Sequence, residues 1–264
     1  MNHFPKIIQT LYANNNRINY IYESLLRIEK KYIFTVLDVG CGTGELVTIP
    51  LAEKGLNLYG IDVDQASIDR AISIARKKKL QNVHFETKNL NDHNRKYDAI
   101  IISEVLEHVH NPKDFLYDIK SHLKKNGRII ITIPNGYGSL EIDLALWNRN
   151  FLFIPKFVKK IIPAAGSHLK ANQKNVFDTL NDFSPHVNFY SWKQFKEILK
   201  KGGFEIESYR PRAFIFGSYA EIVLGLLQKF KIPTGFLCNF NVLISRILPP
   251  QVNADWMVVC KRLK

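Results

Sequence analysis

The chain has 264 residues, of which 46% are hydrophobic and 23% are charged, a balance that is typical of a globular protein and excludes an intrinsically disordered one. The formal net charge of +13 either favours a polyanionic partner, such as nucleic acid or an anionic membrane, or reflects solvated lysine-rich surfaces such as residues 76–79. The three cysteines, Cys41, Cys238 and Cys260, are odd in number and widely spaced, which argues against a disulfide framework or a zinc site and predicts a reducing, cytoplasmic location.

Strand-like and helix-like segments alternate through the first half of the chain. Apolar, β-branched content predicts buried strands at residues 35–39, 56–61, 83–85, 97–102 and 128–133. Helices are expected up to residue 54, at 64–79 with Asp64 as the N-cap, and from Asn111 and Pro112 to 123. Asn126 and Gly127 predict a turn into the fifth strand, which ends at Pro134. The alternation favours a Rossmann-like α/β fold, a mostly parallel sheet with helices on both faces.

The regular alternation breaks after the fifth strand. A capping box at Ser191 and Gln194 predicts a further helix, which Gly202 and Gly203 end. Two more strands are expected at residues 204–209 and 256–260. We therefore expect a single domain over residues 1–264, in which the irregular segments 136–185 and 211–252 are insertions that form a helical cap or an acceptor-binding region.

A glycine-rich turn at residues 38–44 lies between the first expected strand and the helix that follows. Gly40, Gly42 and Gly44 allow positive φ angles and a close approach of the backbone to a ligand at a helix N-terminus. Glu45 stands where the dinucleotide fingerprint requires glycine, which makes NAD the lesser candidate. No P-loop pattern is present, so a P-loop nucleotide is not expected.

A carboxylate follows the second strand, about 20 residues after the glycine-rich turn. At this position Asp62 can accept hydrogen bonds from the two ribose hydroxyls of an adenosine ligand. The alternative is that Asp62 caps the next helix, but Asp64 fits that role better. We therefore interpret Asp62 as a ligand-binding residue.

Four segments together resemble the motifs of class I S-adenosylmethionine-dependent methyltransferases: residues 36–44, 60–64, 97–109 and 123–135. The resemblance covers roughly residues 30–135 and 186–210. It implies a seven-stranded sheet whose last strand is antiparallel, and S-adenosyl-L-methionine as the cofactor.

The resemblance also implies roles for individual residues. Asp38 and the loop residues Gly40, Cys41, Gly42 and Gly44 would hold the methionine end of the cofactor. Asp62 would hold the ribose, and Val63 would lie against the adenine. Asn89 and Leu90 fall where the family contacts adenine, usually through an acidic residue, and Ser103 and Glu104 would flank the cofactor.

Candidate catalytic groups follow the fourth strand and precede the capped helix. Glu107, His108 and the distant His186 are the candidate catalytic residues, with His108 or His186 as the general base. The alternatives are a structural histidine, and a Glu107 and His108 that only stabilise the turn or line the acceptor site. With Glu104 they are similar to a pattern in ubiquinone-biosynthesis O-methyltransferases and small-RNA 2′-O-methyltransferases, which implies Mg²⁺ as an optional cofactor. The same Leu-Glu-His sequence also occurs in family members without a metal.

The acceptor is expected to be a small molecule, a sugar or a lipid-linked compound. The apolar residues of segment 213–250 form either the core of a cap or a surface that contacts a membrane peripherally, with Lys229, Lys231 and Arg246 near anionic headgroups. Glu221 interrupts the most apolar stretch, so no transmembrane helix is expected, and residues 1–10 do not resemble a signal peptide. An RNA acceptor and a non-catalytic binding protein are the alternatives.

Overall fold

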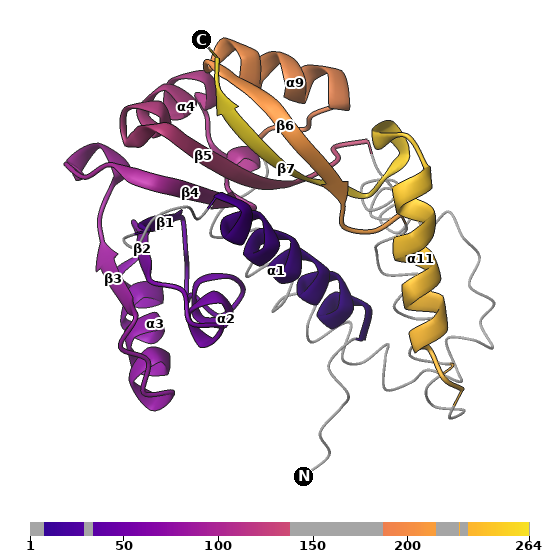
Figure 1. Ribbon diagram of the computed structural model, residues 1–264, viewed down its shortest axis with the longest axis horizontal. Helices are drawn as coiled ribbons and strands as arrows, with labels where there is room; N and C mark the ends of the chain where they lie inside the picture. The colour runs from indigo at the N-terminus through magenta and orange to yellow at the C-terminus, as the bar shows by residue number, and fades with distance from the viewer. Residues whose placement is uncertain (1–7, 29–33, 138–186, 215–226, 228–231, 264) are drawn as a thin grey trace.

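The computed structural model describes residues 8–28, 34–137, 187–214, 227 and 232–263 (Figure 1). Strands are β1 (Val36–Val39), β2 (Leu58–Asp62), β3 (Val83–Thr87), β4 (Tyr97–Ser103), β5 (Leu123–Pro134), β6 (Phe204–Pro211) and β7 (Asp255–Arg262). Helices are α1 (Ile8–Ile28), α2 (Thr48–Glu53), α3 (Gln65–Lys77), α4 (Pro112–Ser121), α9 (Trp192–Lys201) and α11 (Gly235–Ile247). Short 3₁₀ turns are η1 (Leu90–Asp92), η2 (Leu106–His108) and η4 (Pro250–Val252).

The seven strands form one sheet in the order β3-β2-β1-β4-β5-β7-β6. Neighbours from β3 to β5 pair in parallel, whereas β7 runs antiparallel to both β5 and β6. The chain order reverses between β1 and β4, and the carboxyl ends of strands at such a reversal form the usual ligand crevice of open α/β sheets. The predicted Rossmann-like sheet with an antiparallel last strand is confirmed.

Helices cover both faces of this sheet (Figure 1). Alternate residues of a strand point to opposite faces, so Ile100 and Ile102 of β4 join a core on one side and Ile101 joins a core on the other. The first core includes residues of α4 and α9, and the second includes residues of α1 and α2. A smaller cluster joins α3 to Phe85 of β3.

Local sequence signals set the ends of two helices as predicted. The Asp64 carboxylate accepts a hydrogen bond from the backbone amide of Ser67 at 2.9 Å and caps α3. In the capping box of α9, the Ser191 hydroxyl accepts from the Gln194 amide and the Gln194 side chain accepts from the Ser191 amide. These contacts satisfy backbone donors that the first helical turn leaves without partners.

Other local expectations differ from the structure. The helix expected up to residue 54 is only the short α2, because Gly44 has a φ of +69° and residues 45–47 form a turn. The turn expected at Asn126 and Gly127 lies inside β5, where the pairing with β4 shifts register and the extra residues bulge. The strand expected at 256–260 extends over Asp255–Arg262 because it pairs on both edges.

One long helix, α1, was not among the expected elements. Its residues Ile18, Ile21 and Leu25 recur at helical spacing and are buried against the sheet. The segment 136–185 lies almost entirely outside the described residues, whereas α11 and η4 belong to the segment 211–252. The division into one domain with two insertions stays a prediction.

Candidate cofactor and acceptor site

The turn after β1 forms a cradle that is packed on one side and open on the other. Gly40 and Gly42 both have positive φ angles, +69° and +52°. A Cβ atom at Gly40 would lie 2.7 Å from Cγ2 of Val105, whereas one at Gly42 would meet nothing within 4 Å. The amides of Gly40 and Cys41 donate to the Ile61 carbonyl of β2 at 2.9 and 3.0 Å, which holds the loop against the end of the neighbouring strand. The open side at Gly42 suits a ligand that approaches the backbone closely.

Asp62 links this loop to the start of α3. Its Oδ2 accepts from the Gly42 amide at 2.8 Å, and its Oδ1 accepts from the Asp64 amide at 3.0 Å. Because each carboxylate oxygen has two acceptor positions, one remains on each oxygen for a pair of ribose hydroxyls. The side chain of Val63, next in the chain, is 73% exposed and offers an apolar surface beside that carboxylate. The capping role considered for Asp62 belongs to Asp64.

The two residues expected near adenine differ in exposure. Asn89 is exposed, and its side-chain oxygen accepts from the Asn91 amide at the start of η1. The Leu90 side chain is buried in the core on the α4 side of the sheet. Any contact of Leu90 with a ligand would therefore involve its backbone, and the adenine roles stay predictions.

Asp38 is a buried acid at the end of β1. Its Oδ2 accepts a hydrogen bond from the Thr48 hydroxyl at 2.6 Å. Burial raises the pKa of Asp38 to about 7, although the Thr48 hydrogen bond and the nearby Arg17 guanidinium lower it and Asp62 raises it further. A carboxylate held at this cost is typical of a functional site and is complementary to a cationic ligand group.

Glu104 occupies a strained backbone position directly after β4. Its φ of +57° lies in the left-handed region that non-glycine residues rarely adopt. The Thr132 hydroxyl of β5 donates to Glu104 Oε1 at 2.7 Å, so Ser103 Oγ, at 2.8 Å from the same hydroxyl, is the donor in that second bond. Such strain persists where surrounding contacts impose it, and it is enriched at functional sites.

Two buried arginines flank Glu104 from distant parts of the chain. Arg17 of α1 and Arg212, which follows β6, each place Nη1 at 3.6 Å from Glu104 Oε1. Arg212 Nε also lies 2.5 Å from Oδ2 of the buried Asp255. Removing ions from water costs several kcal/mol each, so a network of this kind seldom stabilises a fold better than apolar residues would. Its position at the carboxyl edge of the sheet instead indicates a ligand-binding role.

Glu107 lies on η2 with its carboxyl group almost fully buried. Neither carboxyl oxygen has a hydrogen-bond partner among the described residues. Burial and the negative charge of Glu104 raise the pKa of Glu107 well above its usual value. His108 Nε2 is 3.9 Å from Glu107 Oε1, and the Tyr190 hydroxyl, also buried, has no hydrogen-bond partner in the described part of the chain.

The expected catalytic and metal-binding residues are only partly brought together. Glu104, Glu107 and His108 share the segment after β4, but His186 lies outside the described residues. Within the described ranges, no three His, Cys, Asp or Glu side chains are arranged to hold a metal ion. Glu104 is in addition already engaged by Thr132 and the two arginines. For both reasons, the described residues do not by themselves fit a Mg²⁺ site.

Three site residues were absent from the sequence-based expectations: Arg17, Arg212 and Asp255. Arg17 had a detectable signal, because the helical spacing of Ile18, Ile21 and Leu25 would have revealed α1. Arg212 and Asp255 had none, since they lie 43 residues apart and only the pairing of β6 with β7 brings them into contact.

A profile of the family described as "Methyltransferase domain" matches residues 13–209. The ubiquinone biosynthesis O-methyltransferase of Rickettsia typhi is 38% identical over 124 residues, which are 46% of this chain and 50% of that protein. The protein of the same name from Rickettsia akari is 34% identical over 125 residues, 46% of this chain and 49% of that protein. The chain thus spans about half the length of the curated relatives it matches.

Solved structures share the fold at low identity. Magnesium protoporphyrin IX methyltransferase from Synechocystis PCC 6803 with bound SAH aligns with 99% of this chain and 90% of its own, with a TM-score of 0.58 and 15% identity. The [4+2]-cyclase SpnF aligns with 93% of this chain and 80% of its own, with a TM-score of 0.55 and 16% identity. Because the family profile covers most of the chain and these structures share its fold, the chain belongs to the class I S-adenosylmethionine-dependent methyltransferase family.

Proposed function

We propose that this protein transfers a methyl group from S-adenosyl-L-methionine to an oxygen atom of a small-molecule, sugar or lipid-linked acceptor. The observation that carries the proposal is that a cofactor cradle and a buried acid lie at the same edge of the sheet. The cradle comprises the Gly42 amide, Asp62 and Asp38, and the buried acid is Glu107. The cradle suits binding of the methyl donor, and the buried acid suits removal of a proton from the acceptor.

The charges at the carboxyl edge are complementary to those of the donor. Its ribose would be held by Asp62, and its amino group by the carboxylate of Asp38. Arg17 is a buried cation beside Glu104 and suits the carboxylate of the methionine end. Salt links to Glu104 already orient its guanidinium, so binding the carboxylate needs little further ordering.

The bound cofactor would supply an activated methyl group on its sulfonium, so this chain's own residues need only position the acceptor and take up a proton. Glu107 and His108 are the candidate bases, because they lie beside Glu104 and Ser103 at the end of β4. The raised pKa of Glu107 makes its carboxylate a stronger base than an exposed glutamate. Val187 and Asn188 donate backbone hydrogen bonds to the Glu107 carbonyl, which fixes these two residues next to η2.

The relatives support oxygen as the acceptor atom, since the curated proteins at 34–39% identity are named ubiquinone biosynthesis O-methyltransferases. RNA is the second candidate, favoured by the net charge of +13. A non-catalytic or non-methylating role is the third, because a cyclase shares the fold and a fold alone does not determine chemistry. No helix among the described residues is long and apolar enough to cross a membrane.

Calorimetric titration of S-adenosylhomocysteine into the full chain tests the cofactor assignment. We expect saturable binding that Asp62→Ala weakens more than tenfold, because the ribose loses its carboxylate partner. A folded wild-type protein that does not bind the ligand would refute the assignment. Repeating the titration with Mg²⁺ and with a chelator shows whether a metal affects cofactor binding.

Transfer of a labelled methyl group tests the acceptor class. The chain is incubated with S-adenosylmethionine carrying a labelled methyl, and with phenolic compounds, glycans, lipid extract or RNA in parallel, each with and without Mg²⁺. Label in an alkali-stable ether of a phenol, glycan or lipid supports the proposal. Label only in RNA supports the second candidate, and binding without transfer to any class supports the third.

A further inference from the structure

The apolar side of helix α11 faces solvent and its polar side faces the rest of the protein, the reverse of a helix that packs on the core of a water-soluble protein. Its large apolar residues Phe236, Phe240, Leu243 and Ile247 are 73%, 48%, 54% and 77% exposed. They recur at intervals of four, three and four residues, so they form one continuous stripe along the helix. A stripe of this kind normally faces the core.

The inward side of α11 carries small or polar residues instead. Cys238 and Ser245 are buried, and Asn241 accepts a hydrogen bond from the Phe214 amide at 3.1 Å. The Ser245 carbonyl accepts from Asn253 Nδ2 at 3.1 Å. These hydrogen bonds fix the rotation of the helix about its axis, so the apolar stripe cannot turn inward without breaking them.

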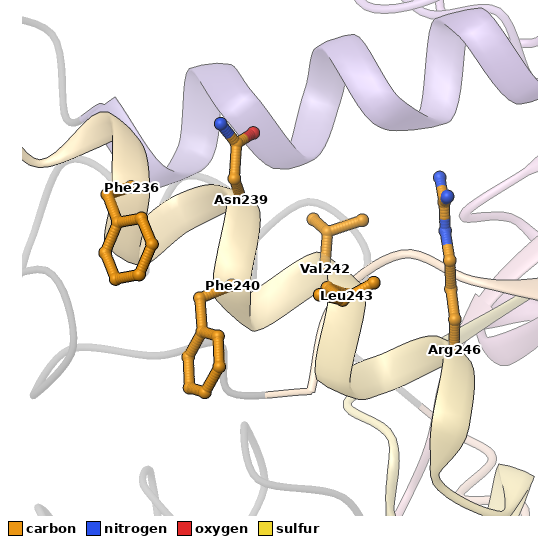
Figure 2. Close-up of a pocket in the computed structure, with 6 residues that line it drawn as sticks. All are labelled: Phe236, Asn239, Phe240, Val242, Leu243 and Arg246. Carbon is orange, nitrogen blue, oxygen red and sulfur yellow. The ribbon is translucent and has the colours of Figure 1, made fainter.

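A hollow of about 360 Å³ lies on the exposed side of α11. It is lined by Phe236, Asn239, Phe240, Val242, Leu243 and Arg246 (Figure 2). The rings of Phe236 and Phe240 are stacked, with centroids 6.1 Å apart and planes at 14°. They project to the same side of the helix, opposite to Asn239 (Figure 2).

The base of α11 is tied to the edge of the sheet that carries the candidate site. Asn135, which follows β5, donates to the Asn253 carbonyl at 2.8 Å, and Asn253 in turn donates to the Ser245 carbonyl of α11. On the same strand, Thr132 binds Glu104. Hydrogen bonds therefore join the C-terminal part of α11 to the edge of the sheet that carries the candidate site.

We propose that the α11 stripe docks on an anionic lipid bilayer, with the helix lying in the interface and its aromatic and aliphatic side chains among the acyl chains. An interfacial helix needs an apolar face with cationic rather than acidic neighbours. The helix contains no acidic residue, and its one charge is Arg246, which lines the same hollow as the apolar side chains.

A second copy of the chain is the rival occupant, but two chains of net charge +13 repel each other, whereas anionic headgroups attract them. Docking rests on α11 alone. Its consequence, delivery of a lipid-linked acceptor to the candidate site, rests on the proposed function.

Co-sedimentation of the full chain with vesicles tests the docking. The vesicles are neutral phosphatidylcholine, or phosphatidylcholine with 30 mol% phosphatidylglycerol as the probe. We expect binding to the anionic vesicles that Phe236→Ser with Phe240→Ser lowers more than tenfold. The matched control is Tyr117→Ser, which removes an aromatic side chain 63% exposed on α4 and leaves binding unchanged. Arg246→Gln is expected to weaken binding to the anionic vesicles but not to the neutral ones.

Three outcomes would overturn the docking: no binding by the wild type, equal loss in the control, or a concentration-dependent dimer that the double variant abolishes and lipid does not affect. Calorimetry with S-adenosylhomocysteine on the same variants separates the two proposals. Binding of S-adenosylhomocysteine without binding to vesicles refutes only the docking. Binding to vesicles by a folded protein that does not bind S-adenosylhomocysteine refutes the proposed function.

Discussion

Replacing Asp38 with asparagine tests whether the buried negative charge in the proposed cofactor cradle lowers the free energy of unfolding. The carboxyl group is fully buried, and its pKa in the folded chain is about 7 against 3.8 for an unperturbed side chain. At about 1.4 kcal/mol per pKa unit, ionising it in the folded protein costs up to about 4 kcal/mol. Asparagine keeps an oxygen that can accept the Thr48 hydrogen bond but carries no charge.

The sign of the pH dependence follows from the linkage between proton binding and folding. Because the folded-state pKa is the higher one, the folded chain binds the proton more tightly than the unfolded chain, and stability is lost as the pH rises from about 4 to about 7. Above pH 7 the full cost is present, whereas near pH 4 it is absent. We expect the free energy of unfolding of Asp38→Asn, relative to wild type, to rise by up to about 4 kcal/mol between these limits.

Urea unfolding of both proteins at several pH values from 4.5 to 8 measures this difference, and the comparison cancels the titration of other buried acids. Calorimetry supplies the functional half: S-adenosylhomocysteine affinity of the wild type should increase as Asp38 ionises, and the variant should bind more than tenfold more weakly. A difference in stability that stays constant across the pH range, or a variant with unchanged affinity, would refute the reasoning.

Three further substitutions test two residues of the candidate site and one helix cap. Arg17→Ala should weaken S-adenosylhomocysteine binding more than tenfold in calorimetry, with partial recovery in Arg17→Lys; equal affinities would remove Arg17 from the site. Glu107→Gln should leave that affinity within about twofold but lower label transfer about 100-fold or more, and unchanged transfer would exclude Glu107 as the base. Ser191→Ala should cost about 1 kcal/mol in urea unfolding without affecting calorimetry, because it removes the capping box of α9; no change in stability would contradict that role.

Parts of the fold that depend on neighbours in the chain were predictable. Alternating strands and helices predict a mostly parallel sheet, and the caps at Asp64 and Ser191 depend on residues three positions away. The glycine-rich turn and the acid after β2 are also local, and each lies at the end of a strand whose apolar sequence marks it. Short-range geometry alone brings the Gly42 amide to Asp62 once β1 and β2 pair.

The α2 and β5 expectations failed for a reason that sequence patterns do not carry. Gly44 belongs to the glycine-rich turn, and its φ is incompatible with helical backbone. The expected helix therefore lacks its first turn. Asn126 and Gly127 carry a strong turn signal, but pairing with β4 and β7 draws the whole segment into β5 and converts the turn into a bulge. Tertiary pairing outweighed local preference there.

The sequence by itself determined the fold class, the glycine-rich turn with the acid after β2, and the family, because each depends on short motifs whose residues are neighbours in the chain or lie at the ends of paired strands. Only the tertiary structure decided the charge network around Glu104 and the outward apolar stripe of α11. The first joins Arg17, Arg212 and Asp255 across more than 200 residues of chain. The second depends on which side of a helix the packing leaves in water, and an apolar stripe reads the same in sequence whether it faces the core or the solvent.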